Sequence, residues 1–174
     1  MNYWFTTHWP LPKGAAPHPP SGVWAKDEHR HLIEEVAPGD LVLIYETKSG
    51  RTAKMRAASG QFERIVRGKG REGIVALVEV TDRAVPLEGA EEQEYEDGTT
   101  RWWRYRAETR PAGDAGFLPR VEVCKIMPYS QDYVFRGFGT QRSGLKRISP
   151  ETFARLREAF LTYGRQSAGA SSGG

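Results

Sequence analysis

The hydrophobic and polar positions along the chain predict a β-rich fold with two buried central strands. Residues Tyr3 to Trp9 alternate between two faces before Pro10 ends the run, which is the pattern of a strand. Leu41 to Tyr45 and Ile74 to Val80 are nearly continuous apolar runs, as expected of strands covered on both faces. The first strand would place Tyr3, Phe5, Thr7 and Trp9 on one face and Trp4, Thr6 and His8 on the other.

Further segments have weaker strand or hairpin patterns. Gln61 to Val66 is a possible strand within a region of glycines, serines and basic residues, and Thr100 to Glu108 is a strand rich in aromatic residues. Val121 to Ile126, an apolar run, is also predicted to be a strand. Glu88 to Thr100 is expected to form an exposed hairpin or long turn around Asp97-Gly98.

Two helices are expected. The first starts near Asp27, an acceptable N-cap, and runs to Val36, before Ala37-Pro38-Gly39-Asp40 ends it. The second has Ser149 as its N-cap and Pro150 at its first position. The residues predicted to face the core are Leu32, Ile33 and Val36 in the first helix and Phe153, Leu156 and Phe160 in the second.

The order of these elements predicts an α+β fold. Central strands separated by long loops favour a mixed or antiparallel sheet curled around a core, and regular βαβ winding is not seen. With 174 residues the chain is expected to form one domain over residues 1–163. Residues 164–174 have the composition of a flexible tail or linker.

No apolar stretch approaches the roughly 20 residues that a membrane-spanning helix needs, and the first ten residues lack the pattern of a signal peptide. We therefore expect a cytoplasmic protein with no membrane partner. Cys124 is the only cysteine and lies in an apolar run, which predicts a buried structural thiol.

Charge is distributed unevenly around a net charge of +3. Residues Lys48 to Arg71 include eight Lys or Arg and one acid, whereas Glu88 to Asp97 include six acids and no base. The basic run is either a solvated loop or a loop that contacts nucleic-acid phosphates. The predicted phosphate-contacting residues are Arg51, Lys54, Arg56, Arg64, Arg67, Lys69 and Arg71.

Motifs typical of catalysis are absent from the sequence. His29 and His31 are two residues apart, whereas a zinc-binding pair on a helix would be four apart. Neither a phosphate-binding Gly-rich loop followed by Lys-Ser or Lys-Thr nor a Gly-x-Ser-x-Gly motif occurs. We expect no enzyme activity, no catalytic residue, no metal and no cofactor.

Trp24 is the aromatic residue that stands apart from the predicted core. It follows Gly22 and a proline-rich loop, and it precedes a charged segment, so it is expected at the mouth of the first helix. A nucleic-acid base can stack on such a ring, which contributes about 1–3 kcal/mol.

Three segments resemble known families. Residues Asn2 to Pro10 resemble the opening strand of EVE domains, and Gly22-Val23-Trp24-Ala25 resembles the Gly-Val-Trp-Ser segment of YTH domains. Pro38 to Tyr45 fits the Gly-Asp plus strand of PUA-like folds. The resemblance extends in order through Gly73 to Val80 and the terminal helix, and it implies a PUA-like curled mixed sheet with flanking helices.

The resemblance also implies a pocket for one base. Trp24 matches the first cage tryptophan of YTH domains, Ala25 the residue whose backbone carbonyl accepts a base amino hydrogen, and Thr7 and His8 a Lys-Ser pair of the first strand. The second wall is left open among Tyr45, Trp102 and Trp103; the two tryptophans are adjacent on a strand, so only one can face a given side. Asp27 completes the predicted pocket.

The function implied is recognition of a modified base, such as 5-methylcytosine, a hydroxymethylated base or N6-methyladenine, flipped into an aromatic pocket. DNA is favoured over RNA, and the chain would be the reading half of a modification-dependent restriction system with a nuclease domain or partner. The alternatives are an RNA modified-base reader and a protein- or small-molecule-binding module, in which the Glu88 to Asp97 acids and Trp102-Trp103 would form the partner surface.

Overall fold

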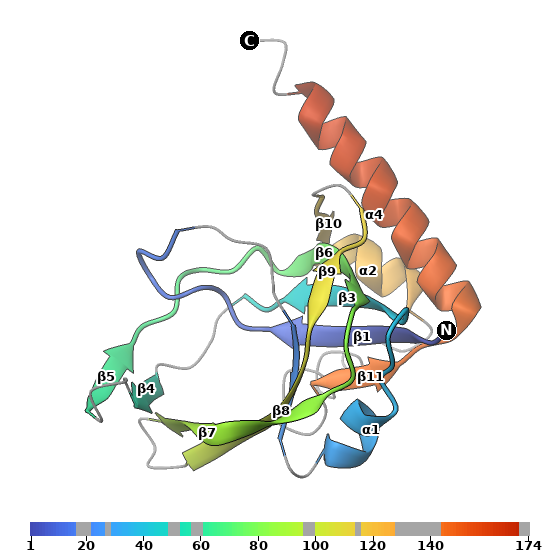
Figure 1. Ribbon diagram of the computed structural model, residues 1–174. Helices are drawn as coiled ribbons and strands as arrows, with labels where there is room; N and C mark the ends of the chain where they lie inside the picture. Colours follow the sequence, from blue (N-terminus) through green and yellow to red (C-terminus); the bar gives the residue numbers. More distant parts are fainter. Residues whose placement is uncertain are drawn as a thin grey trace.

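The computed structural model describes residues 1–16, 22–26, 29–48, 53–56, 61–95, 100–113, 116–127 and 144–170. Within these ranges the backbone alone is described for residues 53, 55–56, 87–95, 100–103 and 164–170. Two β-sheets and three helices make up the described part of the chain (Figure 1).

The first sheet is mixed. Its strands lie in the order β10-β6-β3-β1-β11, and β9 also pairs with β6. β1 and β3 are parallel to each other, and the other pairs are antiparallel. Its strands are β1 (Tyr3–His8), β3 (Leu41–Glu46), β6 (Gly73–Val80), β9 (Thr109–Pro111), β10 (Leu118–Pro119) and β11 (Leu145–Arg147).

The second sheet is antiparallel, in the order β2-β8-β7-β4-β5. It lies below the first sheet in Figure 1, where β4 and β5 form its far end. Its strands are β2 (Val23–Ala25), β4 (Ala53–Arg56), β5 (Phe62–Ile65), β7 (Val85–Tyr95) and β8 (Thr100–Ala107).

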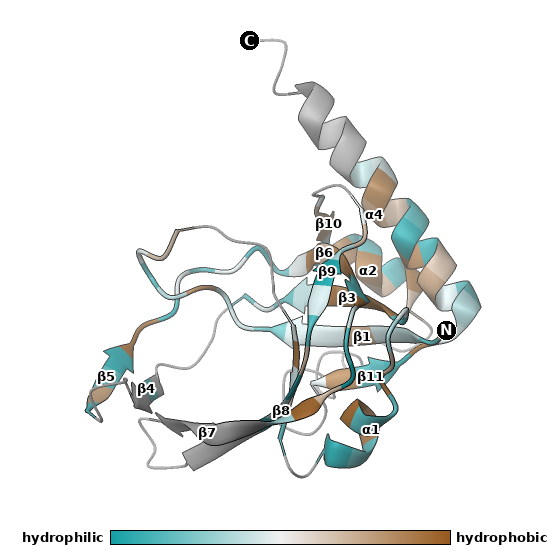
Figure 2. Ribbon diagram, in the orientation of Figure 1, coloured by the Kyte–Doolittle hydropathy of each residue, from teal (hydrophilic) through white to brown (hydrophobic). Residues whose placement is uncertain are grey.

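The helices are α1 (Arg30–Glu34), α2 (Arg120–Ile126) and α4 (Pro150–Ala170). Hydrophobic and hydrophilic residues alternate along the described side chains of α4 (Figure 2), and its apolar stripe is buried. The Thr152 amide donates a hydrogen bond of 3.1 Å to Ser149 Oγ, so Ser149 caps α4 as predicted. None of the described helices is long and apolar enough to cross a bilayer.

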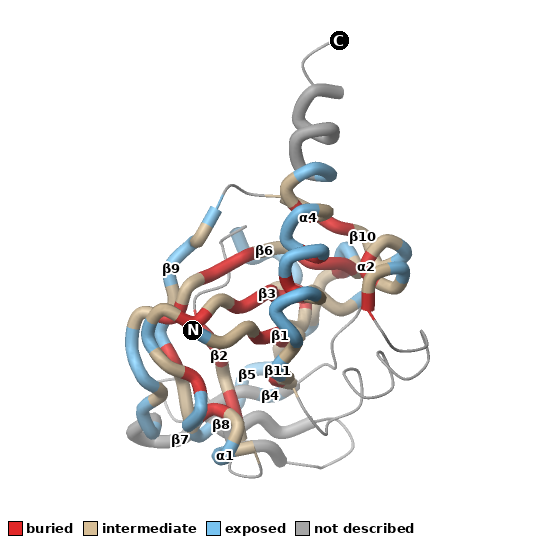
Figure 3. The backbone as a smooth tube through the Cα atoms, turned by 90° about the vertical axis from the view of Figure 1, so that its right-hand side faces the viewer, coloured by how far each residue is buried: buried red, intermediate tan, exposed pale blue. Residues whose placement is uncertain are grey.

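Two core clusters lie on opposite faces of the first sheet because its strands alternate. Phe5, Leu43 and Tyr45 face α2 and α4, and the buried Phe153, Leu156 and Phe160 of α4 complete this first cluster. Trp4, Val42 and Ile44 face the second sheet and α1, together with Val23, Ala25, Ile33 and Val36. The buried positions accordingly concentrate in β1, β3 and β6 (Figure 3).

The central strands and the strands at 61–66 and 100–108 are confirmed within a residue or two, and so is the α+β class with a curled mixed sheet. β7 and β8 pair antiparallel, while Asp97-Gly98, at the centre of the predicted hairpin, lie outside the described residues. The prediction of a strand at Val121 to Ile126 is wrong. Val123 and Met127 are buried four residues apart and joined by a backbone hydrogen bond of 3.0 Å, whereas Val121 is 55% exposed. That spacing is helical, and the segment is α2.

Other boundaries differ from the predicted ones. α1 begins at Arg30, with His29 as its N-cap, and the predicted cap Asp27 lies outside the described residues. β2 and β4 occupy segments for which the sequence predicts no strand, and both form by pairing with neighbouring strands despite their short length. α4 continues to Ala170, past Tyr163, where the sequence predicts a tail to begin.

Candidate nucleic-acid interface

The parallel strands β1 and β3 run in register from Tyr3 opposite Leu41 to His8 opposite Glu46. Their amino ends and their carboxyl ends therefore form two separate places where polar residues gather. The polar side chains at the two ends differ in burial and in hydrogen bonding. These two properties decide which end is available to a ligand.

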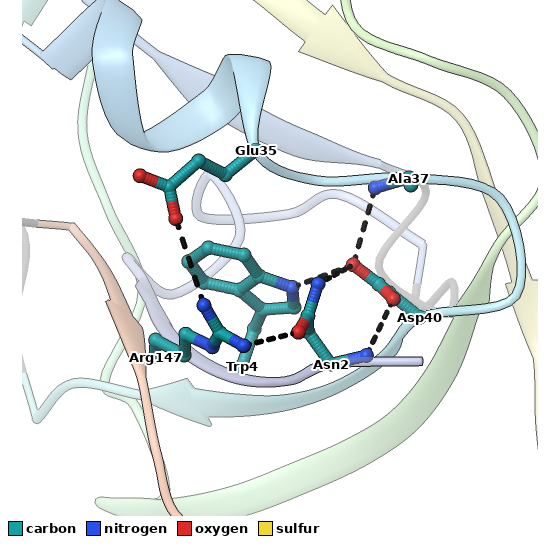
Figure 4. A network of polar contacts seen from close by, with 6 residues as sticks. All are labelled: Asn2, Trp4, Glu35, Ala37, Asp40 and Arg147. Carbon is teal, nitrogen blue, oxygen red and sulfur yellow. Dashed lines mark hydrogen bonds and ion pairs between the residues drawn. The ribbon is translucent and has the colours of Figure 1, made fainter.

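At the amino end, the buried Asp40 carboxylate accepts a network of hydrogen bonds (Figure 4). The backbone amide of Asn2 donates to Oδ1 at 2.6 Å. The Trp4 indole N–H and the backbone amide of Ala37 donate to Oδ2, at 2.9 Å and 3.1 Å. Arg147 donates to Asn2 Oδ1 at 2.5 Å and lies 3.9 Å from Glu35. Both oxygens of the Asp40 carboxylate thus accept hydrogen bonds from donors of the same chain.

The pKa of Asp40 is lower than its ordinary value. Burial acts to raise this pKa, but the hydrogen bonds from Asn2, Trp4 and Ala37 together outweigh it. Gly39 precedes it with φ +87°, a conformation that favours glycine, and its amide donates to the Val80 carbonyl at 2.9 Å. The Gly-Asp pair therefore has a structural role, joining β1, β3 and β6.

At the carboxyl end, three connecting segments are hydrogen-bonded to one another. The Thr47 amide donates to His8 O at 2.9 Å, the Lys13 amide to Val66 O at 2.8 Å, and the Gly70 amide to Lys48 O at 2.9 Å. The segments 9–16 and 66–72 run side by side beyond β1 and β3 (Figure 1). Part of the predicted basic loop is therefore an ordered part of the fold.

Glycines make the contacts between these segments possible. A Cβ atom at residue 70 would lie 1.8 Å from the Thr47 carbonyl oxygen, and one at residue 73 would lie 2.3 Å from the Leu118 carbonyl oxygen. At residue 68 it would lie 3.3 Å from the Leu11 carbonyl oxygen. In the stretch 68–73, the glycines at 68, 70 and 73 pack against backbone, and the residues between them are charged.

Arg67, Lys69 and Arg71, called the cationic triplet below, all lie in the connecting segment 66–72. The Arg67 guanidinium carbon lies 5.6 Å from the centroid of the Trp9 ring, and that of Arg71 lies 5.1 Å from the centroid of Phe117. The Arg71 amide donates to Glu46 Oε1 at 2.7 Å, while Lys69 is exposed. The two arginines lie over rings and Lys69 is exposed between them in the sequence, so the three cations are suited to contact phosphates.

The β4–β5 hairpin carries two further predicted phosphate contacts, Lys54 and Arg64, which are exposed and directly opposite each other. Lys54 also lies opposite Glu94 on β7, so its strand neighbour has the opposite charge. Phe62, 39% exposed at the start of β5, was not predicted as a site residue, although an aromatic beside basic residues was a visible signal.

Trp24 lies in β2, outside both core clusters, and is half-buried. It pairs directly with Arg106 of β8, whose guanidinium carbon lies 4.9 Å from the centroid of the Trp24 ring. Arg106 also forms an ion pair of 3.0 Å with Glu108. Gly22 has φ +121° and passes close to Arg106, where a Cβ atom would lie 3.0 Å from its Nε.

The other predicted pocket residues do not all gather at Trp24. Ala25 is next to it but its side chain is buried in the second cluster. Tyr45 belongs to the first cluster, on the face of the first sheet turned away from β2, so it does not form a wall opposite Trp24. Trp102 and Trp103 lie in β8, and only the backbone of these two residues is described.

Thr7 and His8 end β1, and the Thr7 amide donates to the Gly144 carbonyl at 3.1 Å. Alternation places His8 on the same face as Trp4 and Thr6, toward the second sheet. Burial lowers the pKa of His8 to about 4, so the imidazole is neutral at pH 7.

Asp27 and Arg51 lie outside the described residues, and only the backbone of Arg56 is described. Within the described part of the chain, no group of three or more His, Cys, Asp or Glu residues is arranged to hold a metal ion. Cys124 lies on α2 and is half-buried, whereas the sequence predicts a buried thiol.

Comparison with known structures identifies the fold. Human THYN1, solved in complex with 5-methylcytosine-containing DNA, is similar with a TM-score of 0.51 at 12% identity, covering 91% of this chain and 98% of that chain. Rpa0253 from Rhodopseudomonas palustris, solved by NMR, has a TM-score of 0.47 at 14% identity, covering 93% and 94%. No protein-family model and no curated protein sequence matches the chain. The likeness to THYN1 confirms the predicted PUA-like fold.

Proposed function

We propose that the chain is a DNA-binding reader of a modified base, of the EVE type, and that it has no catalytic activity of its own. The observation that carries the proposal is the cationic triplet, whose guanidinium groups lie over Trp9 and Phe117 on a glycine-packed segment. Cations ordered in this way bind phosphates with less loss of side-chain entropy than free surface lysines.

Two further observations support a base-reading role. Trp24 is a half-buried aromatic outside the core, as a stacking residue must be. The fold is that of THYN1, a protein solved with 5-methylcytosine-containing DNA. Under the proposal, Trp24 stacks on a flipped base while the cationic triplet contacts the phosphates of the same nucleic acid.

A modified base gains affinity from its extra carbon, since a buried methyl group contributes about 0.8 kcal/mol. Flipping the base out of a duplex costs a few kcal/mol, which stacking and phosphate contacts must offset. We propose DNA in preference to RNA, and a nuclease partner of a modification-dependent restriction system as the source of any cleavage.

Titration of the purified protein against matched oligonucleotides tests the proposal. The set is one duplex carrying 5-methylcytosine, 5-hydroxymethylcytosine, N6-methyladenine or no modification, and a single-stranded RNA with or without N6-methyladenine. We expect one modified duplex to bind about fourfold or more tighter than the unmodified one, which corresponds to about 0.8 kcal/mol, the contribution of a buried methyl group. Equal affinity for all DNA probes overturns the proposal, and preference for the modified RNA favours the RNA-reading alternative.

A further inference from the structure

Glu72 adopts an unusual backbone conformation beside the cationic triplet. Its φ of +58° makes it the single non-glycine residue with positive φ among the residues that the structure describes. This region is disfavoured for residues with a Cβ atom, and such residues persist where their surroundings hold them.

Arg120, the first residue of α2, contacts Glu72 twice. Its Nη1 donates to Glu72 Oε1 at 2.8 Å, and its backbone amide donates to the Glu72 carbonyl at 2.9 Å. The side chains of Arg120 and Glu72 are 42% and 28% exposed, so the ion pair by itself contributes little to the stability of the fold.

Glycine would adopt the same conformation without strain, so the backbone alone does not explain a glutamate at this position. What the glutamate adds is the carboxylate that Arg120 binds. The pair joins α2 to the segment that leads from the cationic triplet into β6.

The neighbours of Glu72 show what this connection fixes. Arg71 precedes it, with its guanidinium over Phe117, 5.1 Å from the ring centroid, and 3.9 Å from Glu46. Gly73 follows it and lies so close to Phe117 that a Cβ atom would be 2.6 Å from the ring. Phe117 is separated from Arg120 only by the two residues of β10. The turn at Glu72 thus sets Arg71 against the ring that precedes α2.

We propose that Glu72 and Arg120 are positioning residues, which hold Arg71 over Phe117 in the orientation that contacts a phosphate. The phosphate contact rests on the proposed function; the placement of Arg71 does not. Neither Glu72 nor Arg120 touches the nucleic acid in this account, and both act through Arg71.

Three variants test the proposal: Arg120→Met, which keeps the aliphatic stem, Glu72→Gly, which keeps the conformation and removes the carboxylate, and Arg71→Ala. Arg110→Met is the matched control, because Arg110 binds Glu79 at 2.9 Å in an exposed ion pair on β9 and β6. Thermal melts confirm that each variant is folded.

The first readout needs no nucleic acid. Protons of the Arg71 side chain over the Phe117 ring should show an upfield ring-current shift by NMR. We expect this shift to diminish in Arg120→Met and in Glu72→Gly and to remain in Arg110→Met. An unchanged shift in both positioning variants overturns the proposal whether or not the chain binds DNA.

The second readout is affinity for the 5-methylcytosine duplex. Arg120→Met and Glu72→Gly should each bind about fivefold to tenfold more weakly, with the salt slope reduced by about one phosphate contact. In the Arg71→Ala background, Arg120→Met should cause no further loss. A full, independent loss in that background overturns the proposal. Failure of the wild-type protein to bind any oligonucleotide refutes the proposed function instead, and the NMR shift still decides the positioning role.

Discussion

The two ends of the β1–β3 pair use polar residues in opposite ways. At the amino end, Asp40 is buried and its carboxylate accepts hydrogen bonds from Asn2, Trp4 and Ala37 (Figure 4). At the carboxyl end, Lys69 and Arg71 are exposed on a segment whose glycines are packed against backbone. The Asp40 carboxylate is therefore not accessible to a ligand, whereas the positive charges of Lys69 and Arg71 are exposed.

Polar residues that stabilise this fold and polar residues that remain available to a ligand differ in burial and in hydrogen bonding. A buried charge whose donors all belong to the chain stabilises the folded state. A cation that lies over an aromatic ring keeps its charge available to a ligand. Because its side chain is already ordered before binding, it loses less conformational entropy when the ligand binds. Substitutions at the amino end should therefore change the free energy of unfolding, and substitutions at the carboxyl end should change the affinity for nucleic acid.

The largest effect is expected at the amino end, in stability. Asp40→Ala should lower the free energy of unfolding by about 3 kcal/mol, because buried donors left without an acceptor cost about 1–3 kcal/mol each. Urea unfolding measures this change, with the exposed Asp82→Ala as control. A loss below about 0.5 kcal/mol would show that the network is dispensable.

The next largest effect is expected at the carboxyl end, in binding. Changing Arg67, Lys69 and Arg71 together to Gln should weaken binding to modified and unmodified duplexes alike by about thirtyfold, or about 2 kcal/mol. Lys54→Gln with Arg64→Gln is the control, and we expect a smaller loss because Lys54 lies opposite Glu94 in the sheet. A larger loss in the hairpin variant would move the main phosphate contact to β4–β5.

A smaller effect is expected for Trp24→Ala, which removes the proposed stacking surface. Affinity for the modified duplex should fall about tenfold, since base stacking contributes about 1–3 kcal/mol. Trp4→Ala is the control, because Trp4 is fully buried and its truncation should destabilise the fold by about 3–5 kcal/mol. If Trp24→Ala melts as low as Trp4→Ala and keeps its preference for the modified base, Trp24 is not the stacking residue.

A pH dependence of stability also distinguishes the two ends. The pKa of His8 falls from 6.5 in the unfolded chain to about 4 in the fold, so the unfolded state binds more protons between these values. The stability that the neutral His8 contributes is complete above pH 6.5 and is lost as the pH falls toward 4. Denaturant unfolding of His8→Asn should show a flatter profile in this window.

Asp40 should act at lower pH, because its pKa in the fold lies below its ordinary value. Its contribution is present above the unfolded-state pKa of about 3.9 and is lost as the pH falls through the folded-state pKa. For His8, identical pH profiles of unfolding free energy in wild type and His8→Asn between pH 6.5 and 4 would contradict the burial of the His8 imidazole.

The sequence predicted the parts of the fold that depend on local periodicity. The apolar runs at Leu41 to Tyr45 and Ile74 to Val80 became β3 and β6, and Ser149-Pro150 began α4. It failed at Val121 to Ile126, where a short apolar run fits a strand or a helix equally well. β2 escaped prediction because three residues form a strand only by pairing with β8.

For the site, the sequence identified the cations but not their arrangement. Arg67, Lys69 and Arg71 were predicted as phosphate contacts from charge alone, and the rings beneath Arg67 and Arg71 come from residues 9 and 117, far away in the chain. The same distance concealed Arg120 and the Glu72 conformation that it holds. Tyr45 was a candidate wall because strand alternation gives no absolute direction, and the structure turns it toward α2 and α4.

The salt dependence of binding tests the division between the two ends most directly. Affinity for the 5-methylcytosine duplex is measured across a range of salt concentrations for wild type and for the variant with Arg67, Lys69 and Arg71 changed to Gln. We predict a wild-type log–log slope of about −3 or steeper, and a slope closer to zero by about 3 in the variant. Equal slopes for the two proteins would contradict it.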